Sequence, residues 1–166
     1  MSRGFVREDD QEEAPFIPPR APLPDGVANY VTPRGLEQLL QERAGLLEER
    51  ARAGGSDEER RRTQAGIDGR LALLQERINT ARVVEAAADD GEVRFGNTVT
   101  LLHLSGPMKD QEHRWTIVGV DEASVKEHRI AFTAPLARAL MGHRTGDEVE
   151  LPAGAAPQHF RIIGIS

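Results

Sequence analysis

Cysteine is absent from this chain of 166 residues, which excludes disulfide cross-links and thiolate metal sites. Aromatic residues are scarce, at 4% of the sequence, so the chain has material for one small core beside a helical seam. Long apolar runs are also missing, because no segment approaches the roughly 18 consecutive apolar residues of a membrane span. The N-terminus leads into acidic residues rather than the apolar core of a signal peptide. These absences predict a soluble cytoplasmic protein with no membrane partner.

No region of the chain is strongly basic. The net charge of −6 at neutral pH divides into −3 over residues 1–30, −2 over residues 31–90 and −1 over the remainder. Phosphate backbones bind clustered lysine and arginine, so direct binding of nucleic acid is disfavoured. We therefore expect any action near nucleic acid to be indirect, through a protein partner.

Residues 1–30 have the composition of an extended arm. Acidic residues gather first: Glu8, Asp9, Asp10, Glu12 and Glu13. Prolines follow closely: Pro15, Pro18, Pro19, Pro22 and Pro24. Because proline fixes φ and lacks an N–H donor, this composition favours polyproline-like or disordered chain. One interpretation is a loose tail; the other is a docking arm that orders on a partner, with apolar anchors at residues 5–6 and 16–17.

Residues 31–90 carry the pattern of a helical hairpin. Apolar residues in 67–81 alternate at spacings of four and three: Ile67, Leu71, Leu74, Ile78 and Ala81. A matching ladder lies in 36–47: Leu36, Leu39, Leu40, Leu46 and Leu47. Two amphipathic helices on either side of a glycine pair predict an antiparallel coiled coil. Gly66 and Gly69 lower the helix propensity locally, and we expect them to let the two helices approach closely.

Capping signals predict where both helices begin and end. A threonine–proline pair at 32–33 predicts the start of a helix that runs to about residue 53. Ser56, with Glu59 three residues later, matches a capping box. The second helix is therefore expected from about Asp57 to Ala87.

From residue 91 the apolar period changes to the alternation of strands. Strands are predicted around residues 93–101, 115–120, 130–132, 149–151 and 160–165, and a short helix over 135–141. Short strands with one helix predict a small globule over 91–166. The whole chain is therefore expected to be α+β: an extended arm, a helical hairpin and a small β-sheet domain.

Five runs of sequence carry a family signature. They are Tyr30-Val31-Thr32-Pro33-Arg34-Gly35-Leu36, Ala81-Arg82-Val83-Val84, 93–101, 117–123 and 134–142. The most specific is the last, Ala-Pro-Leu-Ala-Arg-Ala-Leu-Met-Gly, followed by Gly146-Asp147-Glu148-Val149. In order and spacing these runs resemble the Gre family of bacterial transcript-cleavage factors, over about residues 30–166.

The resemblance implies an N-terminal coiled coil and a C-terminal FKBP-like domain. In such factors the globular domain grips the rim of the RNA polymerase secondary channel, and the coiled coil enters the channel. Acids at its tip reach the active-site magnesium and help to hold a second magnesium and a water, so that the polymerase hydrolyses backtracked RNA. The implied partner is RNA polymerase, with nucleic acid contacted only through the elongation complex. The factor itself is not an enzyme and needs no cofactor of its own.

The predicted tip departs from the family pattern, which reads roughly Gly-Asp-Leu-Ser-Glu-Asn-x-x-Tyr. Asp57 is the nearest candidate for the metal-binding aspartate, and Glu58 or Glu59 for the glutamate. The leucine, asparagine and tyrosine are missing, and residues 60–62 are arginines. The alternative role for the three acids is structural. Acids in a first turn stabilise a helix by about 0.3–1 kcal/mol each, and the pairs Asp57–Arg61 and Glu58–Arg62 have i,i+4 spacing.

The predicted helices are also shorter than those of the resembled family. Each is shorter by on the order of ten residues, which is about 15 Å at the helical rise. The near-equal loss on both helices preserves their pairing. A tip about 15 Å short of the family's position cannot ligate the catalytic magnesium unless the globular domain docks deeper. Metal ligation tolerates errors of only a few tenths of an ångström in the ligand distances.

A second candidate contact lies at the corner between the third predicted strand and the short helix. Thr133, Ala134, Pro135 and Leu136 occupy the place that contacts the polymerase rim in the family. Pro135 and Leu136 match the family pattern, whereas the two preceding residues replace more polar ones. The alternative is an ordinary helix start with proline in its first turn.

Other chemistries have little support. The five histidines include no i,i+4 pair on a helix, so a zinc site is not expected. Neither a phosphate-binding glycine loop nor a nucleophile elbow is present. Prolyl isomerase activity needs an aromatic-lined cavity that so few aromatic residues do not provide. Three hypotheses remain: a regulator that occupies the polymerase channel, which we favour; a stimulator of cleavage; and a hairpin adaptor unrelated to polymerase.

Overall fold

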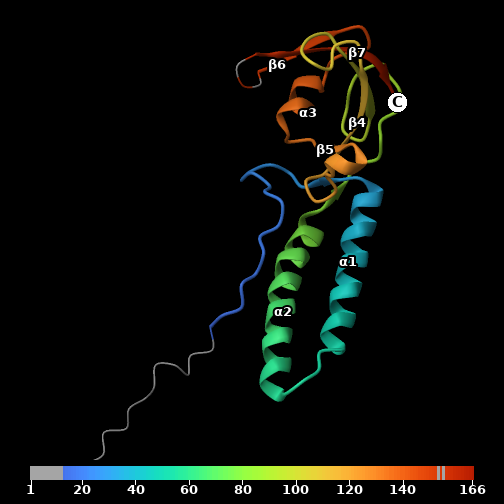
Figure 1. Ribbon diagram of the computed structural model, residues 1–166. Coiled ribbons are helices and arrows are strands. Elements are labelled where there is room, and N and C mark those ends of the chain that lie inside the picture. Colours follow the sequence, from blue (N-terminus) through green and yellow to red (C-terminus); the bar gives the residue numbers. More distant parts are fainter. Residues whose placement is uncertain (1–12, 153, 155) are drawn as a thin grey trace, which may run out of the picture.

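A computed structural model describes residues 13–152, 154 and 156–166 of the chain (Figure 1). Residues 1–12 of the predicted arm, with the anchors at 5–6, lie outside this range. The elements are β1 (Tyr30–Val31), α1 (Pro33–Ala51), α2 (Asp57–Thr80), β2 (Arg82–Val83), β3 (Thr98–His103), β4 (Glu112–Val118), η2 (Val125–Glu127), β5 (Arg129–Ala131), α3 (Pro135–Leu140), β6 (Glu148–Leu151) and β7 (Gln158–Ile165). Within the described part of the chain, no helix has both the length and the apolarity that crossing a membrane requires.

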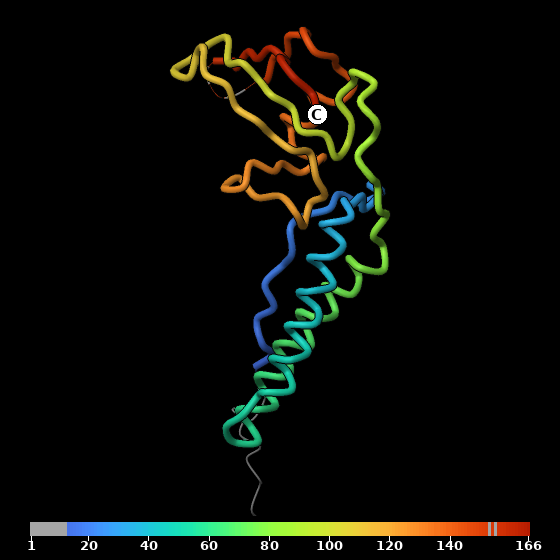
Figure 2. Tube along the Cα trace, turned by 90° about the vertical axis from the view of Figure 1, so that its right-hand side faces the viewer, coloured from blue at the N-terminus to red at the C-terminus, as the bar shows by residue number. Residues whose placement is uncertain are grey.

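Helices α1 and α2 lie side by side as an antiparallel rod that projects from the sheet domain (Figures 1 and 2). The predicted hairpin is thus confirmed. Its seam buries Val31, Leu39, Leu46, Ile67 and Leu74, and Leu36, Leu71, Ile78 and Ala81 pack against them. Two members of the predicted ladder, Leu40 and Leu47, instead face solvent, with 39% and 51% of their surface exposed.

Helix α2 ends at Thr80 rather than at the predicted Ala87. Ala81 leaves the helical region with φ −59° and ψ 129°, and the next two residues form β2. Strand β2 pairs in parallel with β1, where the Arg82 N–H donates to the Asn29 carbonyl at 2.8 Å. The pairing across the base of the hairpin therefore overrides the local helical tendency of the alanine-rich segment that follows.

The C-terminal sheet has five strands in the order β5-β4-β3-β7-β6. All neighbours are antiparallel except β4 and β5, which run in parallel. Helix α3 packs on one face of the sheet, and the shared core comprises Val93, Phe95, Val99, Leu101, Ile117, Ala137, Leu140, Val149, Phe160 and Ile162. Val93 and Phe95 are buried as predicted but precede β3. The α+β class is confirmed.

Aromatic packing joins the rod to the sheet domain. The Tyr30 ring lies 6.1 Å from the Phe95 ring and 5.6 Å from the Phe132 ring, between centroids. Beside them Gly119 passes so close to β1 that a β-carbon on it would lie 2.5 Å from the Tyr30 carbonyl oxygen. This close backbone approach leaves no room for any side chain at position 119.

A hydrogen bond fixes the start of α1 to the sheet domain. Thr32 is the N-cap of α1, and its hydroxyl oxygen accepts from the Gly35 N–H at 2.9 Å. The same hydroxyl donates to Glu122 Oε2 at 2.5 Å. Glu122 is 6% exposed, so its carboxylate depends on such donors. The predicted cap is confirmed, and it also ties the two parts of the molecule together.

Residues 13–29, here called the arm, lie against the protein's own hairpin (Figures 1 and 2). They contact α1 and α2 of the same chain. Gly66 and Gly69 face this arm rather than α1, so the expected role of these glycines was wrong: a β-carbon on Gly69 would lie 2.6 Å from Ile17 Cγ1. Phe16 remains exposed over 84% of its surface.

Two histidines meet at one end of the sheet. His103 Nε2 and His113 Nδ1 are 2.7 Å apart on neighbouring strands, and the His103 ring packs edge-on to Phe160 at 4.8 Å. Burial, and secondarily the nearby His113, lower the pKa of His103. The helical spacing test applied to the sequence missed this pair, because strand pairing brings the two residues together.

Alanine substitutions at two glycines of the sheet domain, Gly119 after β4 and Gly164 in β7, test the junction. Gly119→Ala should lower the free energy of unfolding by on the order of 1–3 kcal/mol, because the new methyl group meets a backbone carbonyl that cannot move aside. At Gly164 the new β-carbon would lie 3.7 Å from Thr100 Cβ, an ordinary contact. Gly164→Ala should therefore leave stability unchanged or raise it by up to about 1 kcal/mol. Urea denaturation measures both, and equal effects would contradict the close approach.

Acidification should destabilise the sheet domain through His103. A histidine whose pKa is lower in the folded than in the unfolded protein binds protons more readily in the unfolded state. Its contribution to the free energy of unfolding is therefore complete above the unfolded pKa of about 6.5 and is lost as the pH falls below that value. Urea titrations between about pH 7.5 and pH 5.5 should show a smaller loss of stability for His103→Gln than for the wild type. His159→Gln, an exposed histidine on the same sheet, is the control. A wild-type pH slope in His103→Gln would contradict this assignment.

Candidate functional site

The tip of the rod is the end of the hairpin farthest from the sheet domain (Figures 1 and 2). Gly55, with φ +91°, makes the turn that leads into α2. The capping box is complete: the Ser56 hydroxyl accepts from the Glu59 N–H at 3.1 Å, and Glu59 Oε2 accepts from the Ser56 N–H at 2.8 Å. Hydrogen bonds from Ser56, the backbone one first, lower the pKa of Glu59. Glu59 is therefore engaged in starting the helix.

The other two tip acids are paired with arginines. Asp57 is bonded to Arg60, one turn along, and not to the Arg61 that i,i+4 spacing suggested. Glu58 Oε1 lies 3.6 Å from Arg62 Nη2, as predicted. Asp57 and Glu58 remain highly exposed, at 85% and 64% of their side chains. Exposed pairs of this kind are worth less than about 1 kcal/mol, so both carboxylates can exchange partners.

The tip is balanced in charge. Three acids at 57–59 are followed directly by three arginines at 60–62. Among the residues that the structure describes, no group of three histidine, cysteine, aspartate or glutamate side chains is arranged to hold a metal ion. A hard cation such as magnesium needs converging oxygen ligands. The tip offers one capping glutamate and two exposed acids in local ion pairs.

The rod sets the distance between the tip and the domain. Helix α2 has 24 residues, which corresponds to about 36 Å at the helical rise. The shorter α1 has 19 residues, or about 28 Å. The tip acids, at the start of α2, are therefore separated from its other end by about 36 Å.

The candidate rim residues lie in the sheet domain: Thr133 and Ala134 precede α3, and Pro135 and Leu136 begin it. Ala134 is the N-cap of α3 without a side-chain hydrogen bond, and Pro135 occupies the first turn. Pro135 is exposed, whereas Thr133, Ala134 and Leu136 are half-buried. Leu136 also packs against the core of the domain. Pro135 is thus the most accessible of the four, and the structure does not bring this group together with the tip acids.

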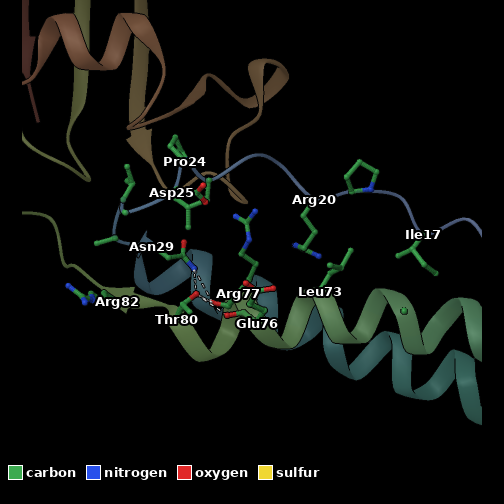
Figure 3. Close-up of a pocket in the computed structure, with 16 residues that line it drawn as sticks. Ile17, Arg20, Pro24, Asp25, Asn29, Leu73, Glu76, Arg77, Thr80 and Arg82 are labelled. Atoms are coloured by element: carbon green, nitrogen blue, oxygen red, sulfur yellow. Dashed lines mark hydrogen bonds between the residues drawn. The ribbon is translucent and has the colours of Figure 1, made fainter.

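A hollow of about 910 Å³ lies between the arm and the basal half of α2 (Figure 3). Asn29 closes one end, where its Nδ2 donates to the Arg77 carbonyl at 3.0 Å and to Thr80 Oγ1 at 3.3 Å. The lining mixes apolar residues such as Leu73 with both signs of charge, including Glu76. This mixture does not select one ligand chemistry, and the hollow marks where the arm rests on the helix.

A buried carboxylate of the sheet domain, Asp121, was missed by reasoning from the sequence. Asp121 Oδ1 accepts from Arg20 Nε at 3.0 Å, and its Oδ2 accepts from Arg77 Nη1 at 3.2 Å. Only 6% of the Asp121 side chain is exposed. The one available signal was the acidic pair within the 117–123 run, but nothing local in the sequence indicates that two distant arginines meet it.

The sequence of this chain is similar to those of known proteins over most of its length. Residues 88–166 match the family described as transcription elongation factor GreA/GreB, C-terminal part. Transcription elongation factor GreA of Nitrobacter winogradskyi is 36% identical over 135 residues, covering 80% of this chain and 81% of the relative. GreA of Nitrosococcus oceani is 35% identical over 138 residues, covering 81% and 83%.

Two solved structures were also matched. GreA factor homolog 1 of Thermus thermophilus is 22% identical over 84% of this chain and 99% of its own, with a TM-score of 0.39. The GreA/GreB factor of Nitrosomonas europaea is 22% identical over 82% and 98%, with a TM-score of 0.41. The family assignment rests on the sequence relatives, which are similar over four fifths of both lengths. This chain belongs to the GreA/GreB family of transcription elongation factors.

Proposed function

We propose that this protein regulates transcription by binding RNA polymerase at its secondary channel, with the tip of the hairpin inserted. The observation that carries the proposal is a stiff two-helix rod with a charged tip, fixed to a domain whose sequence matches the GreA/GreB C-terminal part. Relatives named transcription elongation factor GreA support polymerase as the partner. We place the action in the cytoplasm, with nucleic acid reached only through the elongation complex.

Occupancy of the channel suits the tip better than donation of metal ligands. Glu59 is held in the capping box, and Asp57 and Glu58 pair with arginines of the same turn or the next. Donating Asp57 or Glu58 to a metal would break a pair worth less than about 1 kcal/mol, so the shorter reach of the rod is the stronger argument for occupancy. The protein then acts as an accessory factor without catalytic activity or a resident cofactor.

Stimulation of RNA cleavage is the second candidate function. It is favoured by the exposure of the Asp57 side chain, 85%, and by the weakness of exposed ion pairs. In this case Asp57 and either Glu58 or Glu59 would assist the polymerase's own magnesium. The reach of the rod decides between the two functions, because ligands must approach a magnesium ion to about 2.1 Å.

Binding at the rim can be tested with Pro135→Asp. A charge placed on this exposed corner should weaken the binding of core RNA polymerase about tenfold, as expected where an interface residue costs more than 1 kcal/mol. The matched control is Ala156→Asp, which adds the same charge at another exposed position of the sheet domain. Affinity measured by pull-down or biolayer interferometry checks this. Absence of binding by the wild type would exclude both polymerase functions and leave the unrelated adaptor.

Cleavage is tested with a backtracked elongation complex and labelled RNA. We expect the wild type to alter the rate of elongation or pausing without shortening the transcript beyond what polymerase does alone. Asp57→Asn should leave this behaviour unchanged, because the paired acid is not a metal ligand in our proposal. Magnesium-dependent shortening that disappears in Asp57→Asn would instead establish the second function.

A further inference from the structure

The arm follows α2 in step with the helix. Ile17 lies over Gly69, and the Ala21 carbonyl accepts from the Arg77 guanidinium. An extended chain rises about 3.1 Å per residue and an α-helix about 1.5 Å. The four steps from Ile17 to Ala21 therefore span about 12 Å, the same as the eight steps from Gly69 to Arg77. The arm and α2 run in the same direction and stay in register between these contacts.

Gly69 leaves the space on α2 into which Ile17 of the arm packs; this contact is called the seat of the arm. A β-carbon there would lie 2.6 Å from Ile17 Cγ1, so any larger residue displaces the isoleucine. Glycine inside a helix weakens it relative to alanine. Gly45, in the interior of α1, has nothing within 4 Å of the corresponding position. The two glycines are thus chemically matched, but only one of them is covered by the arm.

Arg20 connects the arm to two further parts of the molecule. Its guanidinium holds Glu42 of α1 with bonds of 2.8 and 3.1 Å, and its Nε donates to Asp121 at 3.0 Å. The hydrogen bond to Glu42, ahead of the charge of Asp121, raises the pKa of Arg20. Arg77 holds the second oxygen of Asp121. The buried carboxylate of Asp121 in the sheet domain therefore binds both the arm and α2. Through Glu42, Arg20 also connects α1 to this group.

On the rod, the contact of Arg20 with Glu42 lies away from the cap at Thr32, whereas on the sheet domain Asp121 adjoins Glu122 in sequence. Thr32 and Glu42 are ten residues apart in α1, which corresponds to about 15 Å along the helix. A rod held only at its base can pivot about that point. A second attachment about 15 Å along the rod resists this rotation, because any rotation about the base would move Glu42 away from Arg20.

We propose that the arm is an intramolecular brace that holds the rod at one angle to the sheet domain. Ile17 seated on Gly69 positions the arm, and Arg20 ties α1 to Asp121 of the domain. The direction in which the tip points is then fixed before any partner binds. This property belongs to the free protein and is independent of what the tip contacts.

Spin labelling can measure the angle directly, since the chain has no cysteine of its own. Ala51→Cys near the tip and Lys126→Cys in the sheet domain are both exposed sites for labels. Double electron–electron resonance on this full-length pair should give one narrow distance distribution. Adding Gly69→Ala or Arg20→Gln should at least double its width, because the seat or the ionic bridge is lost.

Two matched variants control for the substitutions themselves. Gly45→Ala makes the same change on an uncovered helix face. Arg52→Gln removes an arginine whose ion pair, among the residues that the structure describes, is with the exposed Glu48. Both should keep the wild-type distribution. Gly69→Ala favours helix formation, so circular dichroism should confirm an intact rod while the distribution widens. Unchanged widths in both Gly69→Ala and Arg20→Gln would overturn the brace, whatever the result of polymerase binding.

Discussion

Two adjacent buried carboxylates, Asp121 and Glu122, hold the molecule together. Neither can be buried without donors, and the sheet domain does not supply the side-chain donors that they use. Glu122 receives the hydroxyl that caps α1, and Asp121 receives guanidinium groups from α2 and the arm. The sheet domain therefore completes its own hydrogen bonding only when the hairpin is folded and docked. Rod and domain are thermodynamically coupled through one turn of chain.

The tip shows how an acidic cluster can belong to the helix rather than to a metal. Glu59 satisfies a backbone N–H that would otherwise lack a partner at the helix start, and its two neighbours balance the arginines that follow. These arrangements are local and need no contact with the rest of the protein. The tip keeps its shape because of its own sequence, while its position in space depends on contacts far from it, at the junction and along the arm.

Most of the architecture could be predicted from the sequence because it depends on local signals. The spacing of apolar residues in 67–81 indicated the hairpin, the pair Ser56 and Glu59 indicated the helix start, and alternation indicated the sheet. Some locally based expectations failed where distant segments intervene. The end of α2 at Thr80 is imposed by pairing with β1, and Gly69 accommodates a segment some fifty positions earlier in the chain.

The candidate sites were predicted unevenly for the same reason. The capping box and the Glu58–Arg62 pair follow from sequence spacing and are present. The grouping of Arg20, Arg77 and Asp121 requires three segments to meet, and no single-segment pattern indicates it. The accessibility of Pro135 beside the half-buried Leu136 likewise depends on how α3 packs on the sheet.

The arm also changes the cross-section of the rod. Towards the sheet domain from Gly66, where Pro15 approaches the helix, the shaft consists of three segments instead of two. A pore just wide enough for two packed helices would be stopped by this shoulder. It would admit no more than residues 57–65 of α2, about 14 Å of helix, so the thickness of the shaft, and not only its length, limits how deeply the protein can penetrate.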